Sequence, residues 1–155
     1  MSFGTVHHVG VVVLELDSVR LLLERAGVGT IDDPVAEPAL GIEVLWAHLD
    51  GLDLEFVRPL HEDTRAARVL AAGEGGLHHV AFAVDDLDAE LRRLAGDDVG
   101  TLGPARDGVG GARIAFLDPA ATGGTLIELV EPRRVSALPA PDPSDGGAPA
   151  PLPTR

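Results

Sequence analysis

The stretch that decides the fold is residues 6–13, Val-His-His-Val-Gly-Val-Val-Val, because the chain repeats it as Leu-His-His-Val-Ala-Phe-Ala-Val at residues 77–84. The second histidine of the first copy, His8, thus has its counterpart in His79. Both copies are rich in β-branched and other apolar residues, as buried strands are. A repeat of this length predicts two copies of one supersecondary unit.

Each copy leads into the same succession of elements. An acidic residue opens an amphipathic segment, at residues 17–25 in the first half and 85–94 in the second, with the apolar spacing of a helix. Gly27 and Gly96 follow where helices tend to end. Two strand-like segments come next in each half, at residues 42–49 and 54–59 and at residues 112–117 and 127–132. The sequence therefore predicts a module of strand, helix and strands that occurs twice.

A change in composition near Val135 predicts where the folded part of the chain ends. Residues 136–155 hold six of the 12 prolines and almost no large apolar side chains, so they cannot bury enough surface to offset the entropy of ordering. We therefore expect one domain over residues 1–135, with modules at about 5–60 and 76–133, followed by a disordered tail rich in proline and alanine.

The composition excludes several classes of protein. The chain has 25 acidic and 12 basic residues, all of the latter arginine, for a net charge of −13, and this field opposes binding to nucleic acid or anionic membrane. Cysteine is absent, which excludes disulfides and Cys-ligated metals. No apolar run approaches the roughly 20 residues that cross a bilayer, and residues 1–5 carry no signal-like pattern. We expect a cytoplasmic protein with neither nucleic acid nor membrane as a partner.

Polar residues recur at two equivalent places in the modules. His8 and His79 lie in the first strand of each module, and Glu55 and Glu128 lie in the last strand between large apolar residues. One such residue alone usually has an ordinary structural role, but four at equivalent positions favour a shared site. A buried carboxylate is costly unless it is paired or bound to a metal. Two imidazoles and two carboxylates suit a divalent ion such as Zn, Ni, Co or Mn.

The other four histidines have different expected roles. His7 and His78 precede the proposed ligands, and strand alternation would turn them to the opposite face, so we expect structural or supporting roles for them. His48 and His61 have no partner in the repeat, and we expect them at the surface or in turns.

These features resemble the vicinal oxygen chelate superfamily, which includes glyoxalase I and bleomycin-resistance proteins, and within it the methylmalonyl-CoA epimerase branch. The resemblance covers nearly the whole chain except the tail, and the stretch from residue 74 to residue 132 is its most specific part. It rests on residues 6–10 (VHHVG), 75–82 (GGLHHVAF), 84–87 (VDDL), 110–111 (GG), 114–119 (IAFLDP) and 122–129 (TGGTLIEL).

The resemblance implies an α+β fold in which two tandem βαβββ modules form a curved mixed sheet cleft with one divalent ion (Co, Ni, Mn or Zn) at its centre. It implies His8, His79 and Glu128 as ligands, with Glu55 at the fourth position, where relatives carry Gln or Glu. The implied function is a metal-dependent epimerase that moves a proton by way of a stabilised enolate on an acyl-CoA thioester such as methylmalonyl-CoA. A homodimer is the implied assembly.

Epimerisation needs one carboxylate to remove the proton at C2 and a second acid to return it to the opposite face. We expect Glu128 and Glu55 in these catalytic roles, because the repeat symmetry should place them on opposite sides of the metal. Some epimerases carry a glutamate on the preceding strand. Here Val44 occupies that position and Glu43 is shifted by one residue, which turns its side chain to the other face, so we do not expect Glu43 to act.

Alternatives remain open at this point. They are a glyoxalase I-like lyase, a pathway-specific isomerase on another substrate, and a small-molecule-binding resistance-type protein, although such proteins usually lack the metal residues that this chain keeps. The loop at residues 118–121 (Asp-Pro-Ala-Ala) also lacks the lysine usual in the family. An anionic CoA ester would therefore need arginines, and the candidates are Arg58, Arg65, Arg68, Arg106 and Arg113.

Overall fold

The two repeated stretches form the two central strands of one sheet, where they pair with each other. The computed structural model describes residues 4–73 and 75–133. The first half contains β1 (Val6–Val12), α1 (Leu16–Ala26), β2 (Thr30–Ile31), β3 (Val35–Glu37), β4 (Ile42–Leu49) and β5 (Leu52–Pro59). After α2 (Arg65–Ala71), the second half contains β6 (Gly76–Ala83), α3 (Leu87–Gly96), β7 (Arg106–Asp107), a 3-10 turn (Val109–Gly111), β8 (Arg113–Phe116), another 3-10 turn (Pro119–Ala121) and β9 (Ile127–Glu131).

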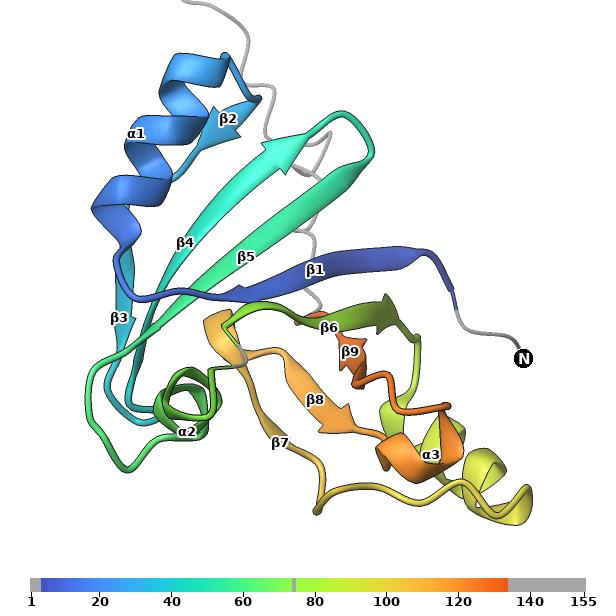
Figure 1. Ribbon diagram of the computed structural model, residues 1–155. Helices are drawn as coiled ribbons and strands as arrows, with labels where there is room; N and C mark the ends of the chain where they lie inside the picture. Colours follow the sequence, from blue (N-terminus) through green and yellow to red (C-terminus); the bar gives the residue numbers. More distant parts are fainter. Residues whose placement is uncertain (1–3, 74, 134–155) are drawn as a thin grey trace, which may run out of the picture.

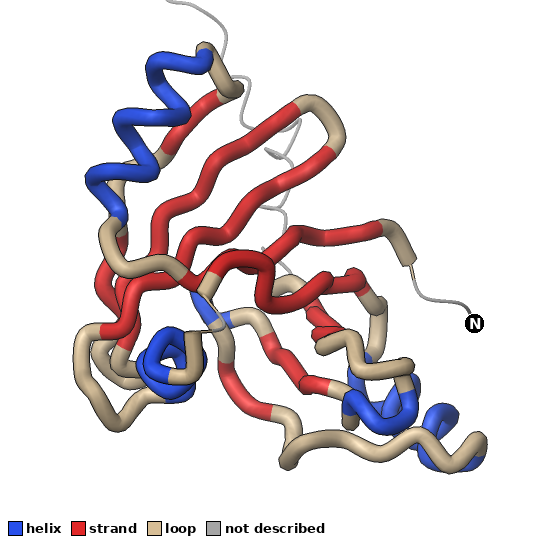
Figure 2. The backbone as a smooth tube through the Cα atoms, in the orientation of Figure 1, coloured by secondary structure: helices blue, strands red, loops and turns tan. Residues whose placement is uncertain are grey.

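The strands form a single curved, open mixed sheet in the order β2-β4-β5-β1-β6-β9-β8-β7, with β3 also paired to β4 (Figures 1 and 2). β1 and β6 run antiparallel, and each has a parallel neighbour from its own half, β5 for β1 and β9 for β6. The predicted α+β fold of two βαβββ modules is therefore confirmed. The first module has one extra strand, because the segment between α1 and β4 pairs with β4 in two pieces.

Both faces of the long strands are buried, with different partners on each face. In β5, Phe56 packs into the core beneath α1, and its neighbour Glu55 faces the cleft. In β9, Leu129 packs beneath α3, and its neighbour Glu128 faces the cleft. One core thus lies between each of these helices and its half of the sheet, and α1 and α3 lie at opposite ends of the molecule in Figure 1. This double burial explains why residues 54–57 of β5 and 127–130 of β9 are apolar except at the two glutamates.

Local signals set several of the helix ends. Asp86 caps α3, where its carboxylate accepts a hydrogen bond from the backbone N–H of Ala89 at 2.8 Å. Gly27 ends α1 in the left-handed region with φ of 67°. The acidic residue expected to open α1, Asp17, lies within its first turn, and the residue at the cap position, Glu15, makes no side-chain hydrogen bond to the helix. Gly96 is the last residue of α3 rather than the residue after it.

The helix α2 was not among the predicted elements. The hydroxyl of Thr64 caps it by accepting a hydrogen bond from the N–H of Ala67 at 3.1 Å, and Ala66 packs beside Val44 and Val57 on the cleft side of the sheet. A cap residue followed by an alanine-rich segment is the signal that would have found it. Since α2 connects the two modules across the cleft side, it places its first residue, Arg65, beside the cavity.

The tail expected at residues 136–155 lies outside the described residues. Among the helices that the structure does describe, none is long and apolar enough to span a lipid bilayer.

We propose that the folded domain ends near Val135, because both cores and every described strand are complete by Glu131. A chain that ends after Val135 should keep the melting temperature of the full chain, as measured by circular dichroism. Leu129→Ala is the matched control, since losing this fully buried side chain should lower the free energy of unfolding by about 2–5 kcal/mol. A large drop for the shortened chain would show that the tail packs on the domain.

Candidate metal centre

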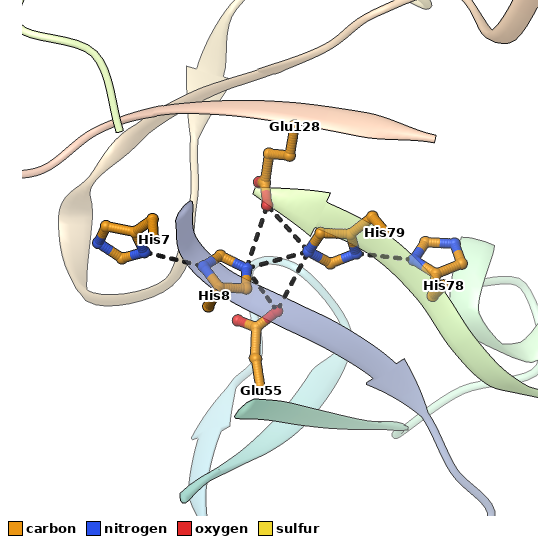
Figure 3. Close-up of polar contacts among 6 residues, drawn as sticks. All are labelled: His7, His8, Glu55, His78, His79 and Glu128. Atoms are coloured by element: carbon orange, nitrogen blue, oxygen red, sulfur yellow. Dashed lines mark hydrogen bonds and ion pairs between the residues drawn. The ribbon is translucent and has the colours of Figure 1, made fainter. Parts of the chain in front are cut away.

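Four buried polar side chains meet in the middle of the cleft (Figure 3). They are His8 of β1, His79 of β6, Glu55 of β5 and Glu128 of β9, and they are only 4 to 7% exposed. The Nε2 atoms of the two histidines lie 3.0 Å apart. From these two atoms, Oε2 of Glu128 lies at 3.3 and 2.9 Å, and Oε2 of Glu55 lies at 3.5 and 3.7 Å. The structure therefore brings together all four residues that the repeat singled out.

The strand register explains why the four side chains converge. Gly10 of β1 is paired with Glu55 on one side and His79 on the other, and Ala81 of β6 is paired with Glu128 and His8 in the same way. The two small residues leave room for the rings above them. A Cβ atom at Gly10 would lie 2.0 Å from Cε1 of His79, so any larger residue there would displace this ring.

The four groups stabilise one another's charged forms. Burial alone would lower the pKa of His8, but hydrogen bonds to Glu128 and Glu55 outweigh it and raise that pKa to about 9. Burial alone would raise the pKa of Glu128, but its contacts with His79 and His8 lower it to about 2. Two buried carboxylates thus need a positive charge between them, which a proton on an imidazole or a metal ion can supply.

The donor set fits a divalent cation. Ligand atoms around a metal with bonds of about 2.1 Å lie roughly 3 to 4 Å from one another, and the distances from the histidine nitrogens to each other and to the carboxylates run from 2.9 to 3.7 Å. Nε2 of His8, Nε2 of His79 and a carboxylate oxygen of Glu55 form a group whose atoms all lie within 4.8 Å of one another. Nitrogen and oxygen donors without sulfur suit Zn, Ni, Co or Mn.

His7 and His78 lie on the same side of the sheet as their neighbours, so the prediction from strand alternation is wrong. In the pairing of β1 with β6, the register shifts by one residue between Val6 and His8, which places His7 in a bulge. It shifts again where Gly10 and Val11 pair with His79 and Leu77, which places His78 in a bulge. Each shift is a β-bulge at the first histidine of the pair, and a bulge re-aims the side chain that it contains. Both rings line the same cavity as the four central residues (Figure 3).

These two histidines support the ones that follow them. Nδ1 of His7 lies 2.9 Å from Nδ1 of His8, and Nδ1 of His78 lies 3.0 Å from Nδ1 of His79. Burial first and then His8 lower the pKa of His7, and burial, His79 and Arg65 lower that of His78 to about 4. Both rings are therefore neutral at pH 7 and can accept a hydrogen bond from the next ring's Nδ1–H. That bond leaves each Nε2 facing the centre as a ligand atom.

A cavity of about 330 Å³ opens onto the four central residues. Trp46 of β4 meets the ring of His8 edge to face at 5.1 Å, and Phe116 of β8 meets that of His79 at 5.4 Å. These aromatic residues pair across the sheet with Glu55 and Glu128 respectively, so they occupy equivalent places in the two halves. The sequence predictions missed both, because their distances along the chain from the glutamates differ, with 9 residues from Trp46 to Glu55 and 12 from Phe116 to Glu128.

Glu43 lies outside this site. Its Oε2 accepts hydrogen bonds from Nη2 and Nε of Arg58 at 2.6 and 3.0 Å, and it does not line the cavity. Val44, one residue further on, is fully buried beside α2. The one-residue shift read from the sequence thus has the expected consequence for the side chain.

His48 and His61 lie outside the site as well. The two ring nitrogens of His48 bridge Asp53 at 2.9 Å and Asp32 at 3.1 Å near the β4–β5 turn. His61 is exposed in the loop before α2. Surface and turn roles are therefore what the structure shows for both.

Comparisons with known proteins give one consistent result. Residues 7–116 match the model of the glyoxalase/bleomycin resistance protein/dioxygenase superfamily. A mitochondrial methylmalonyl-CoA epimerase of Bos taurus is 30% identical over 83% of this chain and 74% of its own length. An ethylmalonyl-CoA/methylmalonyl-CoA epimerase of Cereibacter sphaeroides is 30% identical over 81% of this chain and 96% of its own. A solved structure of a Streptomyces coelicolor methylmalonyl-CoA epimerase variant with 2-nitronate-propionyl-CoA aligns with a TM-score of 0.77 at 26% identity, covering 86% of this chain and 97% of that one.

Gly10→Ala should weaken binding of a divalent cation, because the new methyl group would occupy the place of the His79 ring. We expect a loss of about tenfold to a hundredfold in affinity for Co or Zn by isothermal titration calorimetry, as for other changes that misplace a ligand. Gly103→Ala is the matched control, since its Cβ would meet nothing within 4 Å. Equal affinities for the two variants would contradict this role for Gly10.

Proposed function

Because the chain belongs to the glyoxalase/bleomycin resistance protein/dioxygenase superfamily, we propose that it is a metal-dependent epimerase acting on an acyl-CoA thioester such as methylmalonyl-CoA. The observation that carries this proposal is the approach of two buried carboxylates to one centre from the two halves of the sheet. The names of the relatives favour this reaction over the glyoxalase I-like lyase and the resistance-type binding protein. The homodimer and the cytoplasmic location stay predictions.

The proposed ligands of the ion are Nε2 of His8, Nε2 of His79 and the carboxylates of Glu55 and Glu128. When bound, a divalent ion at this place supplies Lewis acidity that favours negative charge on the thioester oxygen and so makes the C2 proton easier to remove. His7 and His78 keep the two ligand rings oriented through their Nδ1 contacts.

Glu128 and Glu55 are the proposed proton-transfer groups. They come from β9 and β5 and lie on opposite sides of the histidine pair in Figure 3. Inversion at C2 needs a proton to leave from one face and return to the other, and carboxylates on both sides meet that need. Each carboxylate has two oxygens, so one can hold the ion while the other exchanges a proton with C2.

The walls of the cavity serve the same reaction. Trp46 and Phe116 cover the ligand rings, and the side chains of Ile42, Val57 and Val130 add apolar surface around the centre. Such a lining excludes water from the acyl group, which strengthens every electrostatic contact that it makes.

The purified protein should hold about one divalent ion per chain, because the four donors form a single site. Mass spectrometry of the metal content should find this ion in the wild type and in His48→Ala, whose ring lies outside the cavity. His79→Ala should lose most of it. The same metal content in all three proteins would contradict the proposed metal centre.

The second test of the reaction is exchange of solvent deuterium into C2 of methylmalonyl-CoA, followed by NMR. We expect wild-type protein to catalyse it, and Glu128→Gln to lower the rate by about 10²-fold or more, since an amide cannot accept the proton. Glu43→Gln, on the neighbouring strand β4 and outside the cavity, should retain the rate. Absence of exchange by wild type with metal restored would rule out this substrate.

A further inference from the structure

Among the residues that the structure describes, three arginines beside the cavity have no carboxylate partner. Arg65 and Arg68 come from α2 and Arg106 from β7, and all three line the same cavity as the four central residues. Across residues 4–73 and 75–133, none of the three takes part in an ion pair. This is unexpected for a chain with about two acidic residues for every basic one, because a carboxylate is rarely far from any guanidinium on such a surface.

The other two arginines considered as CoA contacts are paired. Arg58 forms an ion pair with Glu43 at 2.6 Å, and Arg113 pairs with Asp88 at 2.9 Å. Neither lines the cavity. The structure thus separates the five candidates into two with ordinary ion pairs and three that face the site.

The ring of Phe116 connects the free guanidinium groups to the metal centre. The guanidinium carbon of Arg65 lies 5.5 Å from the centre of this ring, and that of Arg106 lies 5.9 Å from it, within the range of a cation–π contact. The same ring meets His79 edge to face. Both guanidinium groups and the proposed ligand His79 therefore contact the same aromatic ring.

The charges also repel one another. Burial first, and then the neighbouring Arg106 and Arg68, lower the pKa of Arg65. A group of like charges without a counterion is stabilised by an anion that binds between them. The planar guanidinium fork matches the two oxygens of a carboxylate or phosphate with paired hydrogen bonds.

We propose that Arg65 and Arg106 bind the free carboxylate that a malonyl-type acyl group carries on C2, and that these two residues let the site distinguish such a thioester from that of a simple fatty acid. This inference rests on the proposed acyl-CoA function and names the residues that select its substrate. CoA phosphates are the other anions of such a molecule, but the whole pantetheine arm separates them from the thioester. A carboxylate on C2 is attached to the reacting carbon, and only that end of the substrate lies one ring from His79.

Malonyl-CoA and acetyl-CoA test this assignment, because they carry the same phosphates and differ in the acyl carboxylate. By isothermal titration calorimetry with the metal-loaded full chain, wild type should bind malonyl-CoA about tenfold or more tightly than acetyl-CoA. The double variant Arg65→Gln/Arg106→Gln should lose this preference by weakening malonyl-CoA alone, and each single variant should lose part of it. Arg25→Gln, which removes an exposed arginine in the last turn of α1, should keep it.

Two results would overturn the proposal. One is equal affinity of wild type for the two thioesters. The other is equal weakening of both in the double variant, which would assign the arginines to the phosphates. Because binding of malonyl-CoA needs no proton transfer, an arginine-dependent preference would stand even if methylmalonyl-CoA showed no C2 exchange. The failure of the proposed reaction and the failure of the carboxylate site are therefore distinguishable.

Discussion

The antiparallel pairing of β1 with β6 is the constraint on which the rest of the structure depends. It places each proposed ligand histidine beside a small residue, Gly10 or Ala81, and the parallel neighbour on the far side of that residue supplies a glutamate. A slip of one residue in this register would turn every one of these side chains to the opposite face, into the cores beneath α1 and α3. The buried cores therefore fix the register of β1 against β6, and this register positions the four side chains of the metal centre.

Because both faces of the sheet are buried, the carboxylates and imidazoles at its centre are shielded from water. Glu55 and Glu128 lie among apolar neighbours, where an unbalanced carboxylate is unfavourable, and the histidines between them compensate the charge. The positive charge that these residues require is the same charge that would stabilise an enolate during proton transfer. Arg65 and Arg106 add positive charge to the wall of the same cavity.

Much of this arrangement could be predicted from the repeat. Two copies of a His-containing strand and a Glu-containing strand predicted the module, its duplication and the four central residues, because polar residues at equivalent places in otherwise apolar strands indicated a shared role. The side on which His7 and His78 lie could not be predicted, since alternation assumes a regular strand and both residues occupy bulges. The aromatic cover by Trp46 and Phe116 was missed because apolar residues in a strand give no sign of which one meets a ligand ring.

The sequence by itself determined the module, the choice of nitrogen and oxygen donors in a chain without cysteine, and the acidic surface, since these depend on residue types and on spacing along the strand. Only the tertiary structure decided which arginines are free to meet a substrate. Arg58 and Arg65 look alike in the sequence, but one lies opposite Glu43 in the sheet and the other on α2 beside Phe116. Ion pairing depends on distances between residues that are separated along the chain, and these distances exist only once β4 has paired with β5 and α2 has packed against the sheet.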